Sequence, residues 1–389
     1  MVSIRNQKRK LLKINAVIFN GHFGVIPRPG SNRGYDPTRL YFASSAHCFY
    51  QTNNKKKNCI FAFQTYKDMI SRNSIRIKVM QAIYEYRLSK GIHVDRAEKS
   101  LVQTFDNMYK LYLHLLAIFG ALSCAAEQLI EVKKLRLLPT DTDLRPNYKF
   151  INNFFIKKIE ENLFLQKAKE KQNISWHSDS DIRFLRRIYD QLTLMPIFVE
   201  YMQDLEQSFE KDKTFIIKLT GKFLLENEEI CNYLGEKKLH WQHDYNDAVI
   251  MVYNTLRTFT RTQKPEKTLP PLFKTNEDGI SEDRQFMLDL FRKTIEYTEE
   301  YSQIITQKLI HWEKDRIACV DFILLRMAIC EFCQFPSIPL RVTMNEYIEI
   351  SKYYSTPKSK QFINGMLDGI LADLKAENKI NKQGRGLIG

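Results

Sequence analysis

The chain has 389 residues, enough for two or three domains at about 150 residues each. Hydrophobic residues make up 44% of the chain and charged residues 27%, a globular balance that excludes wholesale disorder, collagen and a disulfide-stabilised miniprotein. The seven cysteines are scattered without a secretory leader, so we expect reduced thiols and a cytoplasmic protein.

The net charge of +14 is concentrated in the first 68 residues. They hold twelve Lys and Arg residues against two acidic ones, a net charge of +10, so the other 321 residues carry only +4. The pI is therefore no argument for nucleic acid, and any basic site has to be local.

Three interpretations of residues 1–68 stay open: a basic nucleic-acid-binding arm, an organellar targeting peptide, or a translation start assigned too far upstream. We favour the last, because an amphipathic helix follows directly after Met69. Under that interpretation the extension is disordered or not translated.

Two apolar stretches predict buried helices. Residues 111–126 are too few for a membrane span and include His114. Residues 317–332 carry Asp321, Arg326 and Glu331, so they also belong in a protein core. No membrane function follows.

Helical periodicity predicts an all-α fold from Met69 onward, and strand signals are nearly absent. The first helix is expected near residues 74–90, and Asp95 is expected to cap the second. Before a proline-rich linker at residues 264–279, amphipathic stretches lie near residues 148–170, 181–209, 211–234 and 241–260.

Further helices are expected after the linker. Ser281 offers an N-cap for a long helix that reaches Leu309. Thr343 and Glu346 have the T-x-x-E spacing of a capping box, which predicts a helix start there. The polar residues 379–389 are predicted to be disordered.

Catalytic motifs are missing: there is no glycine-rich phosphate loop, no G-x-S-x-G and no H-E-x-x-H. Cys330 and Cys333 form one C-x-x-C pair, but without a second pair we interpret them as core or boundary cysteines. His240 and His243 lack a third ligand at fixed spacing, which favours solvated side chains over a metal site. We therefore expect no metal and no cofactor.

A small basic cluster lies at the start of the first helix. Arg72 and Arg76 share one face at i, i+4, and Lys78 follows. Arginine pairs with phosphate through two parallel hydrogen bonds, so the cluster is a candidate nucleic-acid contact. The alternative is an ordinary solvated helix end.

A second basic cluster precedes the last helix. Lys358 and Lys360 lie beside Phe362, where an exposed aromatic ring next to cations can stack on an unpaired base. The alternative is that Phe362 belongs to the core stripe of its helix.

Three segments, read together, resemble one known family. Residues 72–89 (RNSIRIKVMQAIYEYRLS) are similar to an arginine-rich opening helix, and residues 317–332 (IACVDFILLRMAICEF) resemble a buried R-x-A-x-x-E helix. Residues 339–368 carry P-L-R-V-T-M-N-E and FINGMLD, which resemble P-x-x-V-x-[IM]-N-E and F-[VI]-N-G-[VM]-L-D. In order and spacing these motifs resemble the NusB family of transcription antitermination factors.

The resemblance implies an all-helical fold of two small bundles, with subdomains at residues 69–132 and 280–375 and a helical insertion at 133–279. The polar residues 376–389 are expected to form a flexible tail. It also implies no catalysis. NusB proteins bind boxA RNA of nascent ribosomal RNA transcripts together with the ribosomal protein NusE, within the transcribing RNA polymerase complex. At matching positions the RNA contacts implied are Arg72, Arg76, Lys78, Lys358, Lys360 and Phe362.

Two alternatives remain. A NusB-like domain also precedes the catalytic domain of rRNA cytosine methyltransferases, but here the chain ends shortly after the last expected helix. The other alternative is a helical scaffold whose insertion binds another protein and which no longer binds RNA.

Overall fold

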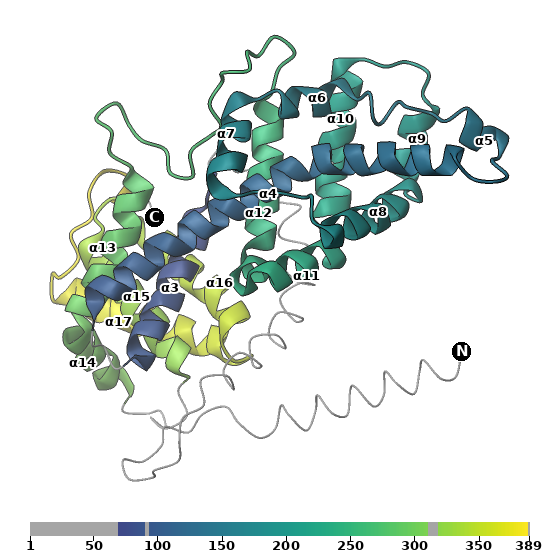
Figure 1. Cartoon of the computed structure of the whole chain (residues 1–389). Helices are drawn as coiled ribbons and strands as arrows, with labels where there is room; N and C mark the ends of the chain where they lie inside the picture. Colours follow the sequence, from purple (N-terminus) through teal and green to yellow (C-terminus); the bar gives the residue numbers. More distant parts are fainter. Residues whose placement is uncertain (1–68, 90–92, 310–317, 388–389) are drawn as a thin grey trace, which may run out of the picture.

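The computed structural model describes residues 69–89, 93–309 and 318–387, and every regular element within these ranges is helical (Figure 1). The predicted all-α class is confirmed. Residues 1–68, with their three interpretations, lie outside the described residues.

The first described helix, α3 (Arg72–Leu88), begins two residues earlier than predicted. Ser71 caps it, because its hydroxyl oxygen accepts a hydrogen bond from the backbone N–H of Ser74 at 3.0 Å. This cap fixes where α3 starts and thereby places Arg72 in its first turn.

The second helix, α4 (Val94–Lys134), has 41 residues and is therefore about 60 Å long. The predicted cap at Asp95 is wrong: the residue before the helix is His93, which makes no side-chain cap hydrogen bond. Asp95 lies in the first turn instead, where its charge still favours the positive end of the helix dipole.

Helix α4 belongs to two bundles (Figure 1). Its first half packs beside α3, and its second half packs against the helices that follow it in the chain. By length and composition α4 is able to cross a membrane. However, half of its most apolar stretch of 18 residues is buried inside the fold. Residues 111–119 are all buried, which confirms the prediction of a core helix.

The insertion bundle, defined as the second half of α4 with α5 to α12, is built from short helices. Its elements are α5 (Asp141–Leu144), α6 (Phe154–Glu160), α7 (Leu163–Gln172), α8 (Asp179–Thr193), α9 (Pro196–Gln203), α10 (Phe209–Leu219), a π-helical turn (Thr220–Leu224), α11 (Glu228–Lys237) and α12 (Leu239–Thr258).

Two side-chain caps and one proline mark breaks within three of the four amphipathic stretches that the sequence predicted. Asn162 accepts a hydrogen bond from the backbone N–H of Leu165 at 2.9 Å and separates α6 from α7. The side chain of Asn227 likewise accepts a hydrogen bond from the backbone N–H of Ile230 at 3.0 Å, and α11 starts there. Pro196 is the first residue of α9, where its missing N–H costs nothing.

The C-terminal body, defined as α3 and the first half of α4 with α13 to α17, contains the predicted closing helices. Its elements are α13 (Glu282–Glu296), α14 (Thr298–Lys308), α15 (Cys319–Gln334), α16 (Leu340–Tyr354), α17 (Ser359–Ala376) and a short 3₁₀ turn (Gly384–Leu387).

Two predictions for the C-terminal body had different outcomes. Ser281 caps α13 as predicted, with its hydroxyl accepting the backbone N–H of Arg284 at 3.3 Å. The capping box at Thr343 is wrong, because α16 already begins at Leu340. Thr343 is a buried residue inside α16, and its hydroxyl donates to Glu331 at 3.2 Å.

The two bundles are joined by polar contacts in the interior. The hydroxyls of Tyr112 on α4 and Thr255 on α12 lie 3.0 Å apart. Lys78 on α3 forms a buried ion pair with Asp244 on α12. Helix α12 therefore packs on the C-terminal body as well as on the insertion bundle, although the sequence assigned it to the insertion alone.

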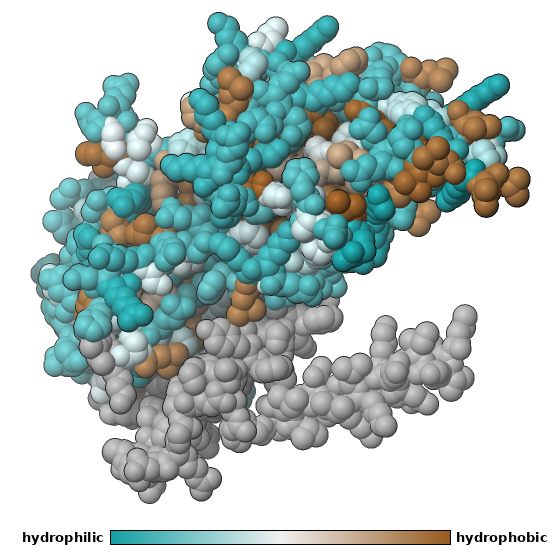
Figure 2. Space-filling view, in the orientation of Figure 1, coloured by the Kyte–Doolittle hydropathy of each residue, from teal (hydrophilic) through white to brown (hydrophobic). Residues whose placement is uncertain are grey.

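Hydrophobic side chains gather at the free end of the insertion bundle, around α5 (Figure 2). The exposed leucines between the end of α4 and the start of α10 include Leu135, Leu137, Leu138, Leu144, Leu194 and Leu205. This end of the molecule thus differs from the charged surface of the C-terminal body.

Candidate nucleic-acid interface

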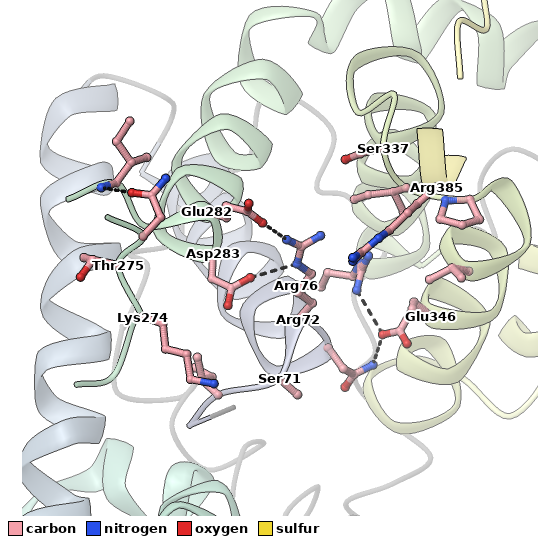
Figure 3. Close-up of a pocket in the computed structure, with 17 residues that line it drawn as sticks. Ser71, Arg72, Arg76, Lys274, Thr275, Glu282, Asp283, Ser337, Glu346 and Arg385 are labelled. Atoms are coloured by element: carbon pink, nitrogen blue, oxygen red, sulfur yellow. Dashed lines mark hydrogen bonds and ion pairs between the residues drawn. The ribbon is translucent and has the colours of Figure 1, made fainter. Parts of the chain in front are cut away.

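A cavity of about 800 Å³ opens where the N-termini of α3, α13 and α16 meet (Figure 3). We call it the α3 cleft. Its lining residues come from these three helix starts, from the linker before α13 and from the chain after α17: Ile70, Ser71, Arg72, Asn73, Arg76, Lys274, Thr275, Asn276, Ile280, Glu282, Asp283, Ser337, Ile338, Pro339, Val342, Glu346 and Arg385.

The α3 cleft suits an anion. The N-terminal end of each helix carries partial positive charge, and three such ends converge here, although Ser71 and Ser281 each already accept one backbone N–H of α3 and α13. The lining includes four basic side chains against three acidic ones: Arg72, Arg76, Lys274 and Arg385 against Glu282, Asp283 and Glu346.

Arg72 is the accessible arginine of α3. Its Nε donates to Asp283 at 2.9 Å, a second guanidinium nitrogen lies 3.7 Å from Glu282, and 41% of its side chain is exposed. Its guanidinium also lies 5.2 Å from the ring centre of Phe286. Half-exposed ion pairs of this kind contribute little to stability, so a phosphate can compete for Arg72.

Arg76, one turn later, is buried: only 2% of its side chain is exposed. Its Nε and Nη2 donate to the two carboxylate oxygens of Glu331, at 2.7 Å and 2.9 Å. Burial by itself lowers the pKa of Arg76, but the charge and hydrogen bonds of Glu331 outweigh it and raise this pKa above its ordinary value. Arg76 is therefore always charged and always paired.

Glu331 collects further donors in the core. Tyr347 donates to it at 2.6 Å and Thr343 at 3.2 Å, and its side chain is fully buried. If Arg76 left this site for a phosphate, an uncompensated carboxylate would remain in the interior. The expectation that Arg76 is an exposed RNA contact is thus corrected: it supports the floor of the cleft.

One edge of the Arg76 guanidinium still borders the cleft. Its Nη1 donates to Glu346 at 3.3 Å, and Asn73 donates to the same carboxylate oxygen at 2.8 Å. Glu346, which the sequence assigned to a helix cap, is instead a wall residue of the cleft that holds α3 against α16.

Lys78 is also buried and does not reach the cleft. Its ammonium group pairs with Asp244, which lies on α12. The predicted basic cluster of three residues is therefore divided among an accessible cation, a buried core pair and a buried contact between the bundles.

The second predicted cluster is separate from the cleft. Lys358 and Lys360 are exposed at the start of α17, whereas Phe362 is half-buried against the core. The cleft lies at the N-terminal end of α16 and Lys358 follows its C-terminal end. This helix has 15 residues and spans about 22 Å, so the two clusters do not form one site.

Sequence reasoning missed two cations of the cleft. Lys274 comes from the linker before α13, and Arg385 from the tail predicted to be disordered. Figure 3 shows both side chains at the cleft, approaching from different sides. Neither has a helical pattern or a motif around it, and only the folded path of the chain brings them to α3.

The cysteine pair has no features of a reactive site. Both cysteines lie on α15, where Cys330 is buried and Cys333 is half-buried, and both are free thiols. Burial raises the pKa of Cys330 to about 12 and that of Cys333 to about 11, so both stay protonated at neutral pH. Within the described residues no three His, Cys, Asp or Glu side chains are grouped to hold a metal ion.

Comparison with known proteins agrees with the motifs. The NusB family model matches residues 248–372. The transcription antitermination protein NusB of Salinibacter ruber is 42% identical over 144 residues, which cover 37% of this chain and 90% of that protein. No solved structure matches the chain.

Two further relatives carry the same name. The NusB protein of Koribacter versatilis is 36% identical over 142 residues, covering 32% of this chain and 97% of the relative. That of Chloroherpeton thalassium is 31% identical over 128 residues, covering 33% of this chain and 61% of the relative.

The family match begins at residue 248, inside α12, and therefore earlier than the C-terminal segment expected from the motifs. This agrees with the packing of α12 on the C-terminal body. Since this chain covers nine-tenths of a relative that is 42% identical to it, the protein belongs to the NusB family.

Proposed function

We propose that this protein is a transcription antitermination factor that binds boxA-type single-stranded RNA of nascent rRNA transcripts together with the ribosomal protein NusE. The observation that carries the proposal is the α3 cleft, where three helix N-termini and the accessible Arg72 surround one cavity. The names of the relatives support the same role.

The chemistry of the cleft fits a single strand. A phosphate displaces Asp283 and Glu282 from Arg72, whose planar guanidinium then holds two phosphate oxygens. Lys274 adds a second cation from the linker. A few such contacts are enough to bind a short unpaired RNA. Each of them makes the affinity fall more steeply as the salt concentration rises.

The protein acts by binding and not by bond breaking, in the cytoplasm and within the transcribing RNA polymerase complex. NusE binds the RNA together with this protein. Lys358 and Lys360 add a weaker contact only when the RNA continues along α16 to its far end.

The test is RNA binding by the full chain, with and without NusE, over a salt series. Arg72→Gln should weaken binding by about 1–3 kcal/mol and reduce the salt slope. The matched control is Arg145→Gln, which removes an exposed arginine at the far end of the insertion bundle and should leave binding unchanged.

Two outcomes would contradict the proposal. A wild-type protein that ignores boxA-type RNA even with NusE favours the scaffold alternative. An Arg72→Gln variant that binds like wild type, while Arg145→Gln binds less, moves the RNA site to the insertion bundle.

A further inference from the structure

The C-terminal segment after α17 turns back onto the C-terminal body. Asn378 adopts a left-handed backbone conformation with φ 54°, and the N–H of Lys379 donates to the carbonyl of Leu374 at 3.0 Å. This hydrogen bond ends α17 and reverses the direction of the chain. The segment that follows runs to the end of α15.

Lys382 fastens this segment to α15. Its ammonium group donates to the backbone carbonyls of Glu331 at 3.0 Å and Phe335 at 2.9 Å. The carbonyls in the last turn of a helix lack intrahelical partners, and this end carries partial negative charge, so a cation is favoured there. Burial lowers the pKa of Lys382 to about 8, which leaves it mostly charged at neutral pH.

Two backbone contacts hold the next residues in place. The N–H of Gln383 donates to the carbonyl of Pro336 at 3.0 Å. Gly386 is buried against the same carbonyl, and a Cβ atom at this position would lie 1.9 Å from the Pro336 oxygen. Only glycine allows this approach. The segment 378–387 is thus a fixed part of the fold, contrary to the predicted flexible tail.

Arg385 lies between Gln383 and Gly386, which both contact the Pro336 carbonyl, and it lines the α3 cleft. Its side chain is exposed, and it makes no hydrogen bond or ion pair with any other residue in the described ranges. The three acidic residues of the cleft lie in ion pairs with other arginines: Asp283 and Glu282 with Arg72, and Glu346 with Arg76. The guanidinium of Arg385 therefore lies at the cleft without an ion pair of its own among the described residues.

We propose that residues 378–387 form a strap whose purpose is to hold Arg385 in the α3 cleft as a phosphate-binding residue. This inference rests on the proposed function, because the phosphate is that of the bound RNA. The strap adds to the cleft a cation that neither the basic helix α3 nor the linker provides.

The test compares two variants of the full chain with wild type, in the presence of NusE and boxA-type RNA. Arg385→Gln removes the charge and keeps the strap. Gly386→Ala keeps the charge and displaces the strap from Pro336. Both should weaken binding several-fold at low salt and reduce the salt slope by about 1. The double variant should bind no more weakly than either single variant, since both remove the same contact.

The matched control is Lys375→Gln, which removes an exposed charge from the last turn of α17 without touching the strap. It should bind like wild type. If Arg385→Gln also binds like wild type with an unchanged salt slope, the inference is overturned while the proposed function stands. If wild type itself does not bind the RNA, the proposed function fails and the inference fails with it. Thermal unfolding of each variant separates lost contacts from lost folding.

Discussion

The insertion bundle and the C-terminal body bury their interiors in different ways. In the insertion bundle the core is aromatic, with the rings of Phe184 and Tyr233 stacked at 3.8 Å and Trp176 beside them. In the C-terminal body the core holds a charged network, in which Arg76 and Glu331 are paired without access to solvent. Buried carboxylates also occur in the insertion bundle, where Asp212 accepts a hydrogen bond from Tyr201, but the fully buried arginine–glutamate pair belongs to the C-terminal body.

Because the C-terminal body buries charge in its core, the sequence of an arginine-rich helix does not by itself show which arginines can bind RNA. On α3, adjacent turns carry Arg72, which is half-exposed at the cleft, and Arg76, which is sealed in the core. The spacing in the sequence is that of one helix face, but Glu331 from α15 decides which of the two is buried. The other accessible cations of the cleft, Lys274 and Arg385, come from the linker and the C-terminal tail.

The largest effect is expected for Arg76→Ala. It leaves Glu331 buried without its cation, which should lower the free energy of unfolding by about 3–5 kcal/mol. Arg72→Ala, one turn away on the same helix, should change it by less than about 1 kcal/mol because its ion pair is half-exposed. Urea unfolding of both variants measures the contrast. Equal losses for the two arginines would show that Arg76 has no special place in the core.

A pH dependence is expected from the insertion bundle. His114 lies between Trp176 and Trp241, and its Nδ1 has no partner among the described residues. Burial, together with the charges of Lys237 and Lys110 and against the pull of Asp181, lowers the pKa of His114 to about 3. The unfolded chain, with an ordinary histidine pKa near 6.5, takes up a proton first as the pH falls.

This histidine therefore favours folding above pH 6.5, and its contribution is lost as the pH falls from about 6.5 toward 3. Between pH 7 and pH 4 the wild type should lose about 3 kcal/mol more stability than His114→Phe. Unfolding curves at the two pH values measure this difference. Parallel losses in both proteins would mean that the imidazole is protonated in the folded state.

The smallest effect is expected at the second basic cluster. Replacing Lys358 and Lys360 together by Gln should weaken RNA binding less than Arg72→Gln and reduce the salt slope by less than about 1, because both lie a helix length from the cleft. Binding titrations at several salt concentrations compare the variants. A larger loss than for Arg72→Gln would place the main RNA contact at the start of α17.

Much of the fold follows from the sequence, and the reasons for the failures are local. Periodicity found the core helix α4 and the cap at Ser281, because both signals lie within a few neighbouring residues. It merged α6 with α7, since the cap of Asn162 looks like any polar residue in a helix. It misplaced the start of α16, because the T-x-x-E spacing at Thr343 serves contacts to other helices.

The candidate site was less predictable than the fold. The sequence identified α3 and Arg72, but the cleft is assembled from chain segments up to about three hundred residues apart. The partner of Lys78 lies on α12, and Arg385 reaches the cleft only because Lys382 and Gly386 fix the tail. Such long-range contacts leave no periodic pattern in the sequence.

The most direct measurement is the affinity of the full chain for boxA-type RNA with NusE, determined over a salt series for wild type, Arg72→Gln and Arg145→Gln. We expect wild-type affinity to fall as salt rises, Arg72→Gln to bind more weakly with a smaller salt slope, and Arg145→Gln to match wild type. Identical curves for Arg72→Gln and wild type would contradict RNA binding at the α3 cleft.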